Sequence, residues 1–152
     1  MVILLDTAFV LSLILETDET DIAKKYFEET TDSLVISISV YEEAFYVGVK
    51  LLAEERLNIK GKYDLRDYIK KKGYGFAKDF LERFHKLLGL VTLIDDTKNT
   101  NLVRNVAEKY GLLPNDALIA ATCKHHGIRK IATFDPDFKR VDFLEILELE
   151  EE

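Results

Sequence analysis

Three aspartates stand where apolar, strand-like segments of the sequence end. Asp6 directly follows the apolar run of residues 2–5, and Asp135 comes shortly after a second run, residues 130–133. Asp116 lies in the first turn of a helix predicted further along the chain. Ligands of an open parallel sheet bind beyond the carboxyl ends of its strands, and neighbouring strands are only ~4.8 Å apart. If these strands are neighbours, the three carboxylates meet at one end of the sheet.

Each aspartate taken alone also has a purely structural explanation. Asp6 and Asp135 are placed where they can cap a helix, whose first amide groups have no partner within the helix. Asp116 would face the positive end of its own helix dipole. A cap is the commoner role for a single aspartate at such a position. The chemical interpretation therefore depends on a further acid.

Glu43 is that further acid. A helix predicted over residues 40–56 places Glu43 on the same face as Val40, Ala44 and Val47, whereas Glu42 points to the opposite side. A charged group on an apolar face needs a partner, because an unpaired buried charge is strongly unfavourable. One alternative is a salt bridge to a nearby lysine or arginine; the other is that Glu43 faces the cavity that the aspartates share.

Four crowded carboxylates repel one another, and a bound divalent cation removes that conflict. The set offers oxygen ligands only, without a cluster of cysteine or histidine, which suits Mg²⁺ or Mn²⁺. Such a site can lower the pKa of a bound water and neutralise charge on a scissile phosphate. The four acids thus predict hydrolysis of a phosphodiester bond.

The elements that must position these acids alternate along the chain. Strands are predicted over residues 2–5, 34–38, 90–94 and 130–133, with a further one over 143–149. Helices are predicted over residues 8–14, 21–29, 40–56, 76–88, 100–110 and 114–127, while the pattern weakens over 58–75. Alternation of this kind is typical of a three-layer α/β/α sandwich around a mostly parallel sheet of four or five strands.

Length and composition agree with one globular domain. The 152 residues are 47% hydrophobic and 32% charged, and we expect a single domain over residues 1–149 followed by an acidic tail, 150–152. The one cysteine, Cys123, excludes an intramolecular disulfide and a multi-cysteine zinc site. Because no apolar run approaches the ~20 residues of a membrane span, we expect no membrane association and a location in the cytoplasm.

Positive charge is concentrated in one segment of an otherwise acidic chain. Residues 60–78 hold seven bases and two acids, a balance of +5, so the remainder of the −7 chain carries −12. Tyrosines and a phenylalanine interleave with these bases, a pattern used to bind single-stranded RNA. The alternative is a solvated amphipathic helix whose tyrosines belong to the core. The candidate RNA-binding residues are Lys60, Lys62, Arg66, Lys70, Lys71 and Lys72.

Four segments in order resemble the PIN domain family, in particular its VapC-type toxin ribonucleases. Leu4-Leu5-Asp6-Thr7 resembles the opening signature, and Ser39-Val40-Tyr41-Glu42-Glu43-Ala44 resembles the segment with the second acid. Asn115-Asp116-Ala117-Leu118-Ile119-Ala120-Ala121-Thr122 resembles the family's most specific helix, and Ala132-Thr133-Phe134-Asp135-Pro136-Asp137-Phe138 resembles its ending. The set spans nearly the whole chain.

The resemblance implies a PIN-like fold and a metal-dependent endoribonuclease. Its metal-binding acids would be Asp6, Glu43, Asp116 and Asp135, with Thr7 and Thr133 as supporting hydroxyls and Asp137 as a supporting acid. It also implies an antitoxin partner and a homodimer or higher homo-oligomer. Two departures matter: Glu42 is a second candidate for the acid at position 43, and residues 52–75 form a longer stretch than in compact members.

Two other functions compete with this one. A non-catalytic module of the same fold would bind RNA or protein without cleaving. A phosphatase with an aspartyl nucleophile would need a second aspartate two residues after Asp6, where the chain has Ala8. For the basic segment, the RNA-binding interpretation predicts that alanine at Lys70, Lys71 and Lys72 weakens RNA binding and flattens its salt dependence.

Overall fold

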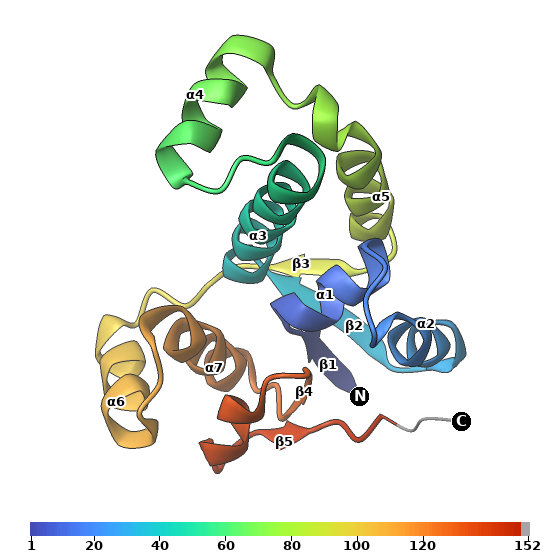
Figure 1. Cartoon of the computed structure of the whole chain (residues 1–152). Coiled ribbons are helices and arrows are strands. Elements are labelled where there is room, and N and C mark those ends of the chain that lie inside the picture. The colour runs from blue at the N-terminus through green and yellow to red at the C-terminus, as the bar shows by residue number, and fades with distance from the viewer. Residues whose placement is uncertain (150–152) are drawn as a thin grey trace.

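A parallel β-sheet forms the centre of the molecule. The computed structural model describes residues 1–149, and in this part of the chain five strands pair in the order β3-β2-β1-β4-β5, all parallel (Figure 1). The strands are β1 (Val2–Leu5), β2 (Ser33–Ser37), β3 (Thr92–Ile94), β4 (Lys130–Ala132) and β5 (Glu145–Ile146). The predicted parallel sheet is confirmed, although β5 is shorter than the strand expected over 143–149.

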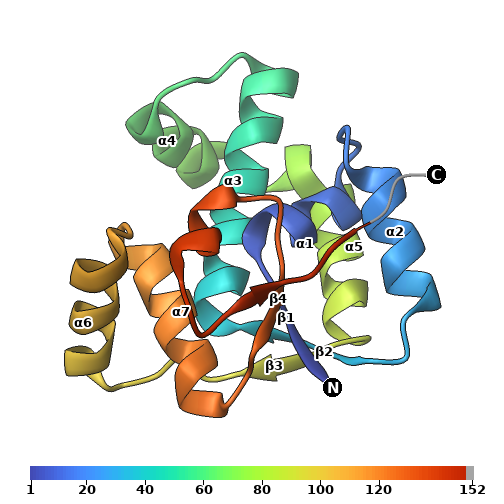
Figure 2. The same cartoon turned by 90° about the horizontal axis from the view of Figure 1, so that it is seen from below.

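Helices cover both faces of this sheet. They are α1 (Thr7–Ile14), α2 (Thr20–Glu29), α3 (Ile38–Leu57), α4 (Lys62–Lys72), α5 (Lys78–Leu88), α6 (Thr100–Tyr110) and α7 (Pro114–His126), with short 3-10 turns η1 (Gly75–Ala77) and η2 (Pro136–Arg140). Helices α6 and α7 pack together on one side, and α1, α2 and α5 lie on the other (Figures 1 and 2). The three-layer α/β/α architecture is therefore confirmed.

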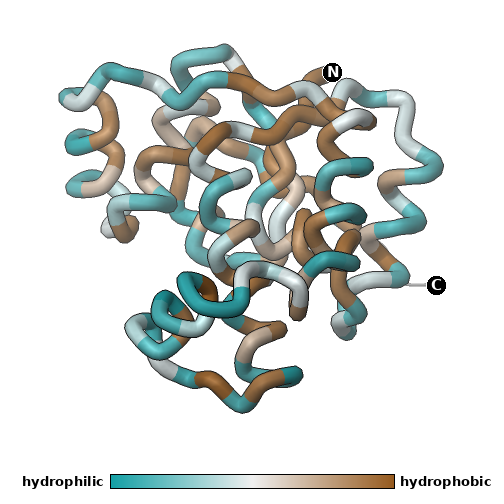
Figure 3. The backbone as a smooth tube through the Cα atoms, turned by 90° about the horizontal axis from the view of Figure 1, so that it is seen from above, coloured by the Kyte–Doolittle hydropathy of each residue, from teal (hydrophilic) through white to brown (hydrophobic). Residues whose placement is uncertain are grey.

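The central strand β1 explains why the site is buried. Ile3, Leu4 and Leu5 are fully buried because β2 and β4 pair with β1 on its two sides and helices cover both faces. The backbone is most hydrophobic through the middle of the molecule, where the strands run (Figure 3). Asp6, the next residue, is thus held at the carboxyl end of the most enclosed strand.

Helix α7 is positioned by residues suited to its two ends. Pro114 occupies the first turn, where the missing amide proton costs nothing, and Gly127 ends the helix with a φ of +70° that favours glycine. Gly111, with a φ of +64°, ends the preceding α6 in the same way. These turns place the N-terminus of α7 beside the carboxyl ends of the strands.

Helix α4 is the main element that the sequence pattern did not single out. Residues 58–75 show a weak pattern because Leu65 is the only residue of α4 that is buried. Helix α4 is largely solvated, but Tyr63 is 67% exposed, so the tyrosines do not all belong to the core as that alternative requires. The RNA-binding interpretation of this segment stays a prediction. No helix among residues 1–149 is long and apolar enough to cross a membrane. The tail predicted at 150–152 lies outside the described residues.

Candidate metal centre

Asp6 is the most buried acid of the site. Its side chain is 4% exposed, and Thr133 Oγ1 donates a hydrogen bond of 2.7 Å to its Oδ2. Burial raises the pKa of Asp6 to about 7, against the lowering effect of the Thr133 hydroxyl and the Thr7 amide, and Asp116 and Glu43 raise it further. The carboxylate makes no capping hydrogen bond to α1. The capping explanation is therefore wrong for Asp6.

Thr133 links two acids of the site. Besides donating to Asp6, its Oγ1 accepts a hydrogen bond of 2.9 Å from the backbone amide of Asp135. The side chain is buried directly after β4, and the Asp6 amide binds the carbonyl of Ala132 at the end of that strand (3.0 Å). The ladder between β1 and β4 sets the separation of the strand ends, and the Thr133 hydroxyl connects the Asp6 carboxylate to the backbone of Asp135.

Asp135 serves both as a cap and as a member of the acid group. Its Oδ1 accepts a hydrogen bond of 2.9 Å from the Asp137 amide at the start of η2, so the capping explanation is correct here. The carboxylate nevertheless offers oxygen within 4.8 Å of oxygens from both Asp116 and Asp137, and the three could together hold a metal ion. Capping uses one oxygen of Asp135 and leaves the other available.

Asp116 projects from the first turn of α7 into this group. It is half-buried, and burial raises its pKa, with further contributions from Asp135 and Asp137 and an opposing one from Arg140. Arg140 Nη2 lies 2.8 Å from Asp137 Oδ1, an exposed ion pair that partly neutralises the outer side of the group. Three carboxylates, those of Asp116, Asp135 and Asp137, thus have one guanidinium, that of Arg140, beside them, and the group keeps a net negative charge.

Glu43 faces the acids, whereas Glu42 is exposed to solvent. Glu43 is half-buried, and among residues 1–149 it forms no ion pair, so the salt-bridge alternative is not supported. Burial raises its pKa, the Thr7 hydroxyl lowers it, and Asp116, Glu42 and Asp135 raise it. Position 43 is therefore the one that shares the electrostatic environment of the aspartates.

The Thr7 hydroxyl lies among these acids without a hydrogen-bond partner. Its Oγ1 is buried and lies close enough to affect the pKa of Glu43, but the pair does not reach hydrogen-bonding geometry. A buried hydroxyl usually has a hydrogen-bond partner, and a water molecule bound to a cation between these carboxylates would provide one. The residues present therefore fit a divalent cation with oxygen ligands.

Sequence reasoning missed two polar residues that hold the start of α3, the helix that carries Glu43. Asp96, shortly after β3, accepts a hydrogen bond of 3.1 Å from the backbone amide of Ser39 and so anchors the start of α3. The N-cap of α3 is Ser37, whose hydroxyl accepts from the Val40 amide. The signal for Asp96 was present, because it comes two residues after a predicted strand, as Asp135 does.

Comparison with known protein sequences agrees with this architecture. A family model described as the PIN domain matches residues 3–144. Ribonuclease VapC6 of Methanocaldococcus jannaschii is 32% identical over 116 residues, which cover 75% of this chain and 72% of that protein. Ribonuclease VapC2 of the same organism is 42% identical over 93 residues, 60% of this chain and 62% of the relative.

Solved structures share the fold at low sequence identity. VapC20 of Mycobacterium tuberculosis, a toxin that cleaves the sarcin-ricin loop, superposes with a TM-score of 0.62 at 17% identity, covering 93% of this chain and 96% of that one. A chain of VapBC2 from Rickettsia felis, solved with a promoter DNA fragment, gives 0.63 at 18% identity, with 99% and 100% covered. At these identities the likeness concerns the fold alone.

Proposed function

This chain belongs to the PIN domain family, as a VapC-type protein, and on that basis we propose that it is a metal-dependent endoribonuclease. The observation that carries the proposal is the grouping of five acids, from four separate segments, near the carboxyl ends of β1 and β4. Oxygens of Asp116, Asp135 and Asp137 lie within 4.8 Å of one another. Asp6 and Glu43 lie close enough for Asp116 to raise the pKa of each. Two M. jannaschii relatives named as ribonucleases support the same activity.

We assign Asp6, Glu43, Asp116 and Asp135 as the metal-binding and catalytic acids. Bound Mg²⁺ or Mn²⁺ would polarise the scissile phosphate of RNA and assist ionisation of the attacking water. Asp116 and Asp135 present carboxylate oxygens toward each other, while Asp6 anchors the inner end of the site. We assign Asp137 a supporting role, because Arg140 already engages one of its oxygens.

The two threonines would position the acids. Thr133 orients the Asp6 carboxylate and holds the backbone of Asp135 in one hydrogen-bond chain. Thr7 offers an unpartnered hydroxyl beside Glu43, which can turn toward the carboxylate or toward an incoming phosphate oxygen. Because Ile3, Leu4 and Leu5 are buried beneath them, these groups need little reorganisation when substrate binds.

We further propose that the protein is the toxin of a toxin–antitoxin pair and assembles as a homodimer or higher homo-oligomer in the cytoplasm. VapC20, which shares the fold, is named a toxin, and two other neighbours come from assemblies named VapBC2 and FitAB. Copurification with the product of an adjacent gene, followed by analytical ultracentrifugation, tests both points. A monomer that no neighbouring gene product inhibits would contradict them.

Cleavage of RNA by the purified chain tests the central activity. We expect single-stranded RNA to be cut internally in Mn²⁺ or Mg²⁺, with activity lost in EDTA and in Asp116→Asn. Asp18→Asn, which changes an exposed aspartate outside the site, is the matched control and should cut normally. Cutting by a folded Asp116→Asn would reject the site, and RNA binding without cutting in any metal would indicate the non-catalytic module.

A further inference from the structure

A groove of about 670 Å³ opens between helices α3 and α4. Helix α4 stands apart from the sheet, beyond the end toward which the parallel strands run (Figures 1 and 2). Glu42 lines the groove, while its neighbour Glu43 faces the acids. The groove and the proposed catalytic centre therefore share helix α3. The size of the groove falls in the ~300–1,000 Å³ range of small-ligand sites.

The walls of the groove carry an excess of positive charge. Lys62, Arg66 and Lys70 occur at intervals of four on α4, so they share one face of the helix, and all three line the groove. Lys60, Lys71 and Lys72 belong to the same basic segment but do not line it. The only acidic residue that lines this part of the described surface is Glu42. The occupant that complements these walls is negatively charged.

The aromatic rings of the basic segment differ in how far they are packed against other rings. Tyr68 and Phe76 pack edge to face, with ring centroids 5.6 Å apart. Tyr63, by contrast, is 67% exposed, and the guanidinium carbon of Arg66 lies 5.1 Å from its ring centroid. The guanidinium lies over one face of this exposed ring, so a nucleobase would stack on the other face or on the guanidinium itself.

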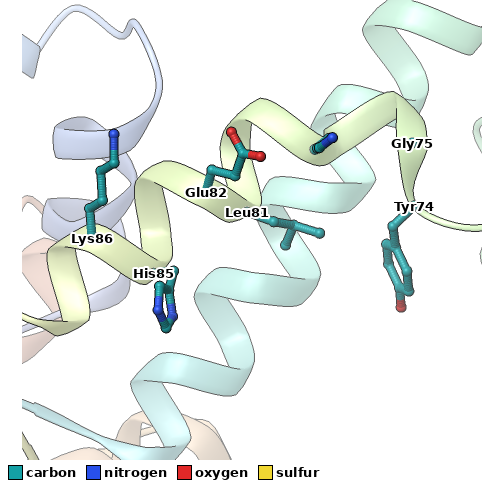
Figure 4. Close-up of a pocket in the computed structure, with 7 residues that line it drawn as sticks. Tyr74, Gly75, Leu81, Glu82, His85 and Lys86 are labelled. Atoms are coloured by element: carbon teal, nitrogen blue, oxygen red, sulfur yellow. The ribbon is translucent and has the colours of Figure 1, made fainter.

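The groove continues past Tyr74 into a second hollow. Tyr74 lines both the α3–α4 groove and a hollow of about 490 Å³ on α5 that Lys78, His85 and Lys86 also line. Figure 4 shows the side chains of Tyr74 and His85 on one side of the α5 ribbon and that of Lys86 on the other. Lys78 and His85 line the second hollow together with an acid, Glu82, so the excess of positive charge is largest in the α3–α4 groove itself.

We propose that the α3–α4 groove is a base-stacking subsite for single-stranded RNA, with an unpaired nucleobase on Tyr63 and phosphates along Lys62, Arg66 and Lys70. The inference rests on the proposed ribonuclease function and deepens it, because it assigns the residues that would hold an unpaired nucleotide of the substrate. Stacking tolerates any base, since each has a π-face. The subsite would thus select unpaired strands rather than one sequence.

Tryptophan fluorescence tests the stacking contact. The chain contains no tryptophan, so Tyr63→Trp introduces a single reporter, and Leu90→Trp, at a site 71% exposed that does not line the groove, is the control. In EDTA, oligouridylate should quench Tyr63→Trp but not Leu90→Trp, and an abasic ribose-phosphate oligomer of equal length should quench neither. Equal quenching of both variants, or quenching by the abasic oligomer, would overturn the subsite.

Two charge-matched triple variants test the phosphate contacts. The groove variant is Lys62→Ala, Arg66→Ala and Lys70→Ala; the control is Lys60→Ala, Lys71→Ala and Lys72→Ala, which removes the same charge. If each groove base contacts one phosphate, the slope of log affinity against log salt should fall by about 2 in the groove variant and by much less in the control. Equal losses in the two variants would overturn the subsite.

These readouts separate the subsite from catalysis, because EDTA removes cleavage from the binding assays. Cutting in Mn²⁺ without selective quenching would reject the subsite and leave the ribonuclease proposal intact. Selective quenching with no cutting in any metal would reject the ribonuclease and leave the stacking site. Unchanged RNA affinity in the groove variant, with loss of self-association or of an acidic peptide's binding, would assign the groove to a protein and overturn the proposal.

Discussion

At the level of single residues, the protonation state of the Asp6 carboxylate couples metal binding to pH. It is almost completely buried, and among the side chains of residues 1–149 the Thr133 hydroxyl is its one hydrogen-bonded partner. Without a cation, this environment favours the protonated acid, which is why its pKa rises to about 7. A bound cation would reverse that preference, so metal binding should release protons near neutral pH.

Replacement of Asp6 by asparagine should stabilise the metal-free protein at neutral pH. The folded pKa of about 7 exceeds the unfolded value of about 3.9, so between these values the native state binds more protons than the unfolded one. The free energy of unfolding of the wild type therefore falls as pH rises from about 4 to 7, by on the order of 4 kcal/mol for this group.

Urea unfolding in EDTA measures this effect. We expect Asp6→Asn to be more stable than the wild type at pH 8 and similar to it near pH 4, while cutting no RNA. Asp116 and Glu43, whose pKa values are also raised, should leave a smaller slope of the same sign in the variant. A variant less stable than the wild type at pH 8 would contradict the raised pKa.

Thr133 should act as a positioning residue whose hydroxyl matters more than its methyl group. Thr133→Val keeps the shape but removes the donor to Asp6 and the acceptor for the Asp135 amide. We expect RNA cleavage to fall 10- to 100-fold, the usual effect of losing a partner of a metal ligand, and Thr133→Ser to retain most activity. The metal concentration for half-maximal activity should rise in the valine variant alone; equal behaviour of the two would contradict the role.

The sequence predicted the positions of the individual acids better than it predicted whether each would cap a helix or face the other acids. The helical wheel distinguished Glu43 from Glu42, and the structure places Glu43 with the acids and Glu42 in solvent. Asp135 combines the two roles that the pattern presented as alternatives. The resemblance implied a supporting role for Asp137, but its approach to within 4.8 Å of Asp116 depends on the conformation of η2, which the sequence pattern does not give.

Among the elements, α3 depends on a close approach to α5. A Cβ built on Gly48 would lie 2.1 Å from the ring atom Cζ of Phe80, so no larger residue fits without displacing that ring. Phe80 is buried in the core and has little room to move. Because α3 also carries Glu43, this contact connects the packing of two helices to the geometry of the site.

Gly48→Ala should therefore destabilise the protein by about 1–3 kcal/mol, the usual cost of forcing an extra group into a packed core. Gly75→Ala is the control, since a Cβ there meets nothing within 4 Å. Thermal unfolding followed by circular dichroism measures both. A Gly48→Ala variant as stable as Gly75→Ala would show that the two helices separate easily.

The strands could be predicted from the sequence because they are buried and therefore apolar. Helix α4 could not, because it is mostly exposed. Residues 2–5 and 130–133 stand out as apolar runs since they lie inside a sheet covered on both faces. Helix α4 buries only Leu65, so its sequence is dominated by charge and carries little periodicity. The pattern began this helix at residue 40, whereas the structure begins it at Ile38, with Ser37 as the N-cap whose hydroxyl accepts from the Val40 amide.

At the scale of the whole molecule, acidic and basic side chains are separated in a way that suits both metal binding and RNA binding. The acids that would hold a cation gather at the strand ends, while residues 60–78 carry a balance of +5 on a helix that stands apart from them. An RNA strand would be drawn to the basic side and reach the acids only where a cation neutralises them. Raising salt should therefore weaken substrate binding more than it weakens metal binding.

The location of manganese in a crystal soaked with Mn²⁺ tests the central claim most directly. We predict an anomalous difference peak among Asp6, Glu43, Asp116 and Asp135, at about 2–2.5 Å from carboxylate oxygens, and no such peak in crystals of Asp116→Asn. A peak elsewhere on the chain with these four acids empty, or a peak that persists at the site in Asp116→Asn, would contradict the assignment of the metal centre.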